Sequence, residues 1–200
     1  MINIVIGIDV DGVLTDIGEF KLKQILEYLR KNSKGNLDYL DEMSENDEVK
    51  ELNFIKKNIF RFAKDVKPTL GASKNIKKLK NDGHTIYIIT ARLLARPSIN
   101  KLMDPTGKLK NKMRKLVVDW LDEHQIFYDN IFFTNKDKSS TIIKNKIDVM
   151  IEDSVENIKS LSNITKVICM NREYNKNIKG NNIIRCYNWD EIYDKIKELF

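Results

Sequence analysis

Cysteine and histidine are scarce in this chain of 200 residues, which contains two of each. Two cysteines, Cys169 and Cys186, are too few for a disulfide framework, and no short metal-ligand spacing joins them. We expect both to be buried thiols in a reducing compartment. His84 and His124 have no partner at metal-ligand spacing, so we expect them to serve in surface or core packing.

Long apolar runs are also missing. No run of about 18 apolar residues is present, which excludes a membrane-spanning helix. The apolar start, Ile2 to Ile8, lacks a basic leader and continues directly into Asp9, so it predicts a strand. A composition of 42% hydrophobic and 32% charged residues is typical of globular proteins. We therefore expect a cytoplasmic protein with one domain, or one domain that carries a large insertion.

The charge is moderately basic, since 35 lysines and arginines against 29 acidic residues give a net charge of +6. Such an excess could attract nucleic acid, an anionic membrane or a phosphorylated substrate. The basic residues are spread along the chain without a dense block, which favours a solvated basic surface. We therefore expect neither a membrane nor nucleic acid as the partner.

Short apolar or β-branched runs alternate with helical patterns along most of the chain, which predicts an α/β fold: a Rossmann-like parallel sheet flanked by helices. The predicted strands are Ile2–Ile8, Thr85–Thr90, Ile131–Phe133, Val149–Ile151 and Val167–Met170. The predicted helices are Ser73–Lys80, Lys112–Glu123, Ser139–Asn145, Ser154–Leu161 and Trp189–Phe200.

One stretch interrupts the alternation. Between Phe20 and Lys64 no strand is indicated, and leucine and isoleucine recur at helical spacing. This predicts a small helical insertion over residues 17–67, after the first strand, with residues 1–16 and 68–200 forming the core. A second irregular piece, Pro97 to Gly107, is predicted to be a loop.

Polar residues follow the first two long strands where each ends, and ligands of open parallel sheets bind at that edge. Asp9 and Asp11 point the same way on an extended backbone, and Gly12 allows a sharp turn there. After the next strand, the Thr90 hydroxyl, the Ala91 N–H and the Arg92 guanidinium could meet a phosphate oxygen. Alone, each feature also suits an ordinary turn or strand end.

Two further candidates lie later in the chain. Glu152 and Asp153 follow the predicted strand Val149–Ile151, where acids also serve as helix N-caps. Lys138 precedes a predicted helix, although a single lysine carries little information in so lysine-rich a chain.

Over nearly its whole length, the chain resembles the haloacid dehalogenase superfamily of phosphotransferases. The four motifs of that superfamily match, in order, Asp9-Val10-Asp11-Gly12, Thr90, Lys138 and Glu152-Asp153. Thr90 follows Asp11 by 79 positions, which leaves room for a helical cap of that family in the insertion. The chain is most similar to the deoxyribonucleotidase-like branch and its bacterial nucleotidases. Asp9 to Asp16 is also similar to the opening of capless sugar-acid phosphatases, which need a much shorter gap before the threonine.

The resemblance assigns a role to each motif residue. It implies that Asp9 is the nucleophile and that Asp11 gives and takes the proton. It implies a Mg²⁺ ion held by Asp9, the Asp11 carbonyl and Asp153, with Glu152 beside them. The resemblance also implies that the phosphate is bound by Thr90, Ala91, Lys138 and Arg92.

The implied function is a Mg²⁺-dependent phosphomonoester hydrolase that forms an aspartyl-phosphate and removes phosphate from nucleoside or deoxynucleoside monophosphates. Two alternatives stay open. One is a phosphatase of the same family that acts on a sugar phosphate or a polynucleotide end. The other is a basic nucleic-acid-binding protein, against which the intact set of Asp9, Asp11, Lys138 and Asp153 speaks. The sequence has no glycine-rich loop that ends in Gly-Lys-Ser/Thr, which argues against a P-loop kinase.

Overall fold

The computed structural model describes residues 2–16, 60, 63–92, 106–135 and 137–200. Most of the predicted helical insertion and of the predicted loop at 97–107 lies outside the described residues. Among the described helices, none has the length and apolarity needed to cross a membrane.

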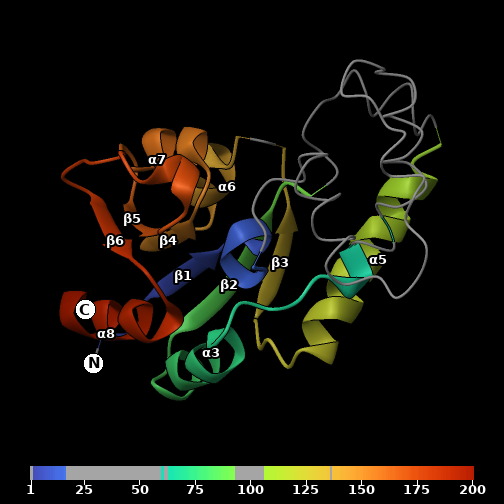
Figure 1. Ribbon diagram of the computed structural model, residues 1–200, viewed down its shortest axis with the longest axis horizontal. Helices are drawn as coiled ribbons and strands as arrows, with labels where there is room; N and C mark the ends of the chain where they lie inside the picture. Colours follow the sequence, from blue (N-terminus) through green and yellow to red (C-terminus); the bar gives the residue numbers. More distant parts are fainter. Residues whose placement is uncertain (1, 17–59, 61–62, 93–105, 136) are drawn as a thin grey trace.

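Six parallel strands form one sheet in the order β3-β2-β1-β4-β5-β6, which confirms the predicted α/β fold (Figure 1). The strands are β1 (Val5–Ile8), β2 (Thr85–Thr90), β3 (Asn130–Phe133), β4 (Val149–Glu152), β5 (Lys166–Met170) and β6 (Ile183–Cys186). The helices are α3 (Ala72–Asn81), α5 (Lys108–Glu123), α6 (Ser139–Lys144), α7 (Val155–Leu161) and α8 (Trp189–Leu199). Two short turns are η1 (Val10–Leu14) and η3 (Glu173–Asn175).

Helices cover both faces of the sheet, so the strands are apolar on both sides. On one face, Ile88 of β2 belongs to an apolar cluster with Trp120 of α5 and Ile192 of α8. On the other face, its neighbour Ile89 lies in a second cluster with Ile158 of α7. Figure 1 shows α3 and α8 on one side of the sheet and α6 and α7 on the other. This explains the continuous apolar runs in the sequence.

The strand order brings three strand ends together at one edge. The chain moves outward from β1 in one direction through β2 and β3, then returns to place β4 on the other side of β1. Ile8 pairs with Ile88 of β2 and Ile151 of β4. The carboxyl ends of β2, β1 and β4 are therefore neighbours, at the place where the strand order reverses and open α/β sheets bind ligands.

Most predicted elements agree with the structure to within about one residue at each end, and three differ by more. Strand β6 was not predicted, because Ile183–Cys186 is short and contains Arg185, and its first three residues are only partly buried at the sheet edge. Strand β1 begins at Val5 rather than Ile2. Helix α5 begins at Lys108, before the predicted start, after Gly107 in a left-handed conformation with a φ of 72°.

The central strand provides a stability test. Ile6 of β1 is fully buried, whereas Ile2 is 69% exposed. We expect Ile6→Ala to lower the free energy of unfolding by about 2–5 kcal/mol, because it leaves a cavity beneath the site. Ile2→Ala, the control, should change it by less than about 0.5 kcal/mol. Urea unfolding measures both values, and equal losses would contradict the placement of β1 at the centre of the core.

Candidate active site

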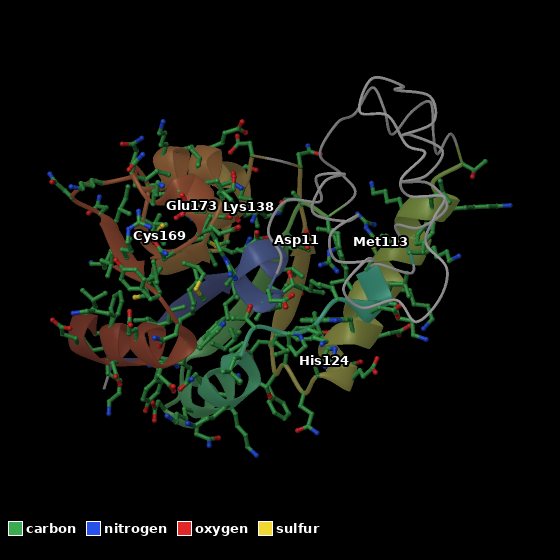
Figure 2. All side chains as sticks on the ribbon, in the orientation of Figure 1. Asp11, Met113, His124, Lys138, Cys169 and Glu173 are labelled. Atoms are coloured by element: carbon green, nitrogen blue, oxygen red, sulfur yellow. The ribbon has the colours of Figure 1, made fainter. Side chains whose placement is uncertain are left out.

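All the candidate residues lie at the carboxyl edge formed by β2, β1 and β4. Asp9 and Asp11 follow β1, Thr90 ends β2, and Asp153 follows β4. Lys138 comes from outside these strands, directly before α6. Figure 2 shows the labelled Asp11 and Lys138 at this edge. Although the residues are up to 144 positions apart, the topology collects them at one place.

Lys138 joins the first and fourth motifs. Its ammonium nitrogen lies 2.7 Å from Asp9 Oδ1 and 2.7 Å from Glu152 Oε2, and its side chain is 1% exposed. Burial alone would lower the pKa of Lys138, but the two carboxylates outweigh it, so the pKa is raised. Lys138 is therefore a buried cation shared by two buried anions.

Both carboxylate oxygens of Glu152 are fully used within the protein. Oε1 accepts hydrogen bonds from the backbone N–H groups of Asp153 and Ser154, both at 3.0 Å. Oε2 accepts from Lys138 at 2.7 Å and from the amide of Asn157 at 3.3 Å. With four donors on a fully buried side chain, Glu152 serves as an anchor for Lys138.

Asp9, Glu152 and Asp153 form a buried acidic cluster, since one oxygen from each lies within 4.8 Å of the others. Burial raises the pKa of Asp9 to about 8, with Glu152 adding to this and Lys138 opposing it. Burial, followed by the charges of Glu152 and Asp9, also raises the pKa of Asp153 well above its usual value. Burial and mutual repulsion thus disfavour the ionised forms of Asp9 and Asp153.

The donor set fits a divalent cation. When ionised, the three carboxylates carry three negative charges, and Lys138 supplies one positive charge. The remaining two negative charges match a divalent ion, and carboxylate oxygens are the ligands that Mg²⁺ prefers.

Asp11 is presented on a tight turn. Asp11 (φ −74°, ψ 123°) and Gly12 (φ 76°, ψ −4°) occupy the two central positions of a type II turn, where the positive φ favours glycine. The Gly12 N–H donates to Thr15 Oγ1 at 3.2 Å. Because C=O and N–H of a trans peptide point in opposite directions, the Asp11 carbonyl is directed away from Thr15. The turn thus fixes the direction of a carbonyl that the sequence predicted to be a metal ligand.

Arg92 binds the Asp11 carboxylate. Its Nε lies 2.9 Å from Asp11 Oδ1, and its Nη2 also donates to Oδ1. The Arg92 side chain is 1% exposed. The guanidinium that the sequence predicted for phosphate therefore orients Asp11 in this structure.

Thr90 and Ala91 lie beside Asp9 at the end of β2. Thr90 is fully buried, and its Oγ1 accepts the Arg92 N–H at 3.2 Å. The Thr90 carbonyl accepts the Thr134 N–H at 2.9 Å, which holds the β2 end against the residue that follows β3. Ala91 is half-buried.

Sequence reasoning assigned no role to the segment after β5, although it contacts the site. Arg172 donates from Nε and Nη2 to the Gly12 carbonyl, at 2.9 and 2.6 Å. Tyr174 donates its hydroxyl to the Asp153 carboxylate. The available signal was position, because Asn171 to Asn175 is a polar segment directly after a buried strand.

Comparison with known proteins matches this chain to nucleotidases. The family model described as "5' nucleotidase, deoxy (Pyrimidine), cytosolic type C protein" matches residues 3–199. A Chlorobaculum tepidum protein named "Putative 5'(3')-deoxyribonucleotidase" is 28% identical, over 98% of this chain and 91% of that protein. A nucleotidase of Clostridium acetobutylicum is 27% identical, over 98% and 94%.

The fold is similar to solved structures of the haloacid dehalogenase type. A haloacid dehalogenase-like hydrolase from Streptococcus pneumoniae aligns with a TM-score of 0.60 at 11% identity, over 97% of this chain and 98% of that one. This similarity and the family match confirm the resemblance inferred from the four motifs.

The Lys138 interactions predict a stability effect. Lys138→Met should lower the free energy of unfolding by about 3–5 kcal/mol in the presence of a chelator, because Asp9 and Glu152 would stay buried without their shared ammonium. Lys144→Met is the control, since Lys144 lies exposed on α6, and it should cost less than about 0.5 kcal/mol. Urea unfolding compares them. Similar losses for the two variants would show that Lys138 is not the buried partner of these acids.

Proposed function

The chain belongs to the family of cytosolic type C 5′-nucleotidases, and from that premise we propose that it is a Mg²⁺-dependent phosphomonoester hydrolase acting through an aspartyl-phosphate. The observation that carries this proposal is the buried cluster of Asp9, Glu152 and Asp153, whose charge Lys138 balances only in part. The family description supports a cytoplasmic location.

Asp9, Asp153 and the Asp11 carbonyl would hold Mg²⁺. When bound, the ion would neutralise the acidic cluster and stabilise the charge of the transferring phosphoryl group. Glu152 takes no part in this coordination, since both of its oxygens bind donors of the protein.

In the first step, an Asp9 carboxylate oxygen attacks phosphorus, and the bond between phosphorus and the ester oxygen breaks. Asp11 gives its proton to the departing oxygen, which leaves as an alcohol. Lys138, 2.7 Å from Asp9, holds the nucleophile in place and opposes the rise in its pKa, which favours the ionised form needed for attack. The product is a phosphoryl group on Asp9.

In the second step, water attacks the same phosphorus and the bond to Asp9 breaks. Asp11, now a carboxylate, takes the proton of that water, so both side chains return to their starting states. Arg92 holds the Asp11 carboxylate in one direction for this exchange.

The phosphoryl oxygens would be bound by groups at the ends of β2 and α6. We assign this role to the Thr90 hydroxyl, the Ala91 N–H and the Lys138 ammonium. Arg92 adds positive charge to the same side of the site while it binds Asp11.

We propose a nucleoside monophosphate as the substrate, with deoxyribonucleotides favoured. The names of the family model and of the Chlorobaculum tepidum relative support this choice. The strand-end residues contact only phosphate and metal, so discrimination between substrates would come from the helical insertion predicted over residues 17–67, which is apolar enough to suit a flat base. Most of that insertion lies outside the described residues.

The proposed activity predicts which substrates have the higher kcat/KM and that turnover requires a metal ion. With Mg²⁺, kcat/KM for deoxynucleoside monophosphates should exceed that for hexose and sugar-acid phosphates by at least about tenfold, which corresponds to about 1.4 kcal/mol of transition-state binding. Excess chelator should abolish turnover of every substrate. A phosphate-release assay measures both effects.

Asp9→Asn is the matched control for that assay, because it keeps the size of the side chain and removes the nucleophile. We expect it to lower kcat by at least about a thousandfold. A tenfold preference for sugar phosphates would overturn the nucleotide assignment alone. Undiminished turnover in chelator would overturn the metal assignment.

A further inference from the structure

The segment Arg172–Asn175, which follows β5, binds both loops that would supply metal ligands. Arg172 binds the Gly12 carbonyl in the loop after β1. Asn175 donates its amide to the Asp153 carbonyl in the loop after β4, at 2.8 Å. Neither Arg172 nor Asn175 belongs to the four motifs, so the end of β5 adds contacts to the site that the motifs do not include.

Tyr174 lies between these two contacts and touches a predicted metal ligand directly. Its hydroxyl donates to Asp153 Oδ2. This hydrogen bond takes one of the two lone pairs of Oδ2 and so competes with a cation for that oxygen. Among the described residues, no donor competes for the other oxygen, Oδ1.

The phenol is held on a fixed support, although its side chain is 38% exposed. Asn175 is fully buried, and its Oδ1 accepts both the Arg172 N–H and Arg185 Nη1 at 3.0 Å. The Asn175 carbonyl accepts Arg185 Nη2 at 2.9 Å. The same Asn175 donates its amide to the Asp153 carbonyl, which ties the backbone next to the phenol to the backbone that carries the carboxylate.

The denticity of Asp153 matters to which cation binds. Mg²⁺ requires nearly octahedral geometry with short bonds and few carboxylate oxygens, whereas Ca²⁺ takes six to eight oxygens and readily accepts both oxygens of one carboxylate. A hydrogen bond to Oδ2 therefore disfavours binding of Ca²⁺ through both oxygens, whereas Mg²⁺ needs only Oδ1.

We propose that Tyr174 determines the cation specificity of the site, by restricting Asp153 to one ligand oxygen and thereby favouring Mg²⁺ over Ca²⁺. This inference rests on the proposed function only in requiring a divalent cation at Asp9 and Asp153. Tyr174 acts through Asp153 and is a positioning residue.

The test is the affinity of the full chain for Mg²⁺ and Ca²⁺, each alone, measured by isothermal titration calorimetry without substrate. In Tyr174→Phe, the ratio of the Ca²⁺ dissociation constant to the Mg²⁺ dissociation constant should fall by on the order of tenfold relative to the unaltered chain, because Ca²⁺ gains a ligand oxygen that Mg²⁺ does not use. Tyr187→Phe removes the hydroxyl of another exposed tyrosine and should leave the ratio unchanged.

The possible results distinguish failure of the role of Tyr174 from failure of the proposed metal site. If the unaltered chain binds Mg²⁺ and Tyr174→Phe keeps its ratio within twofold, the role of Tyr174 is wrong and the metal site stands. If the unaltered chain binds neither cation, the metal site and the role of Tyr174 both fail. Tyr174→Leu, which removes the whole phenol, must shift the ratio in the same direction as Tyr174→Phe. Thermal melting confirms that the variants are folded.

Discussion

The ammonium of Lys138, buried between Asp9 and Glu152, is the interaction on which the arrangement of the site depends. Like charges close together in a buried place repel strongly, so the acids at the ends of β1 and β4 would not stay ionised together without a cation. Glu152 uses its two oxygens to hold Lys138 and to fix the backbone that carries Asp153. One buried lysine thus lies between the acids and balances one of their three negative charges. The two charges that remain match a divalent ion.

The sheet provides the rigid frame for this charge arrangement. Because the strand order reverses at β1, the ends of β2, β1 and β4 are neighbours at one edge of the sheet, and loops from distant parts of the sequence meet there. Apolar clusters on both faces fix the strands beneath. The loops add their own constraints: the type II turn at Asp11 and Gly12 is held from one side by Thr15 and from the other by Arg172. The side chains of the site are therefore positioned by a backbone that hydrogen bonds and apolar packing hold at several points.

The sequence predicted the parallel sheet because buried strands leave a strong local signal, as Thr85–Thr90 shows by matching β2 residue for residue. Strand β6 escaped prediction because an edge strand that is only partly buried has a weak pattern. Lys138 was distinguished from the other lysines by the order of the motifs, since composition carries no such information. The bond of Tyr174 to Asp153 spans 21 positions and depends on how β4 and β5 pair, which no local pattern encodes. The same holds for Arg92, whose partner is 81 positions away.

The most direct test of the account is to trap and locate the phosphoenzyme. Asp11→Asn should slow hydrolysis of the intermediate, because no carboxylate is left to take the proton of the attacking water. Acid-quenched reactions of this variant with Mg²⁺ and a deoxynucleoside monophosphate can be digested and analysed by mass spectrometry. The account predicts one phosphoryl group on the peptide that contains Asp9, and none when Asp9→Asn is added or Mg²⁺ is withheld. A phosphoryl group on another residue, or continued turnover without any phosphorylated peptide, would contradict it.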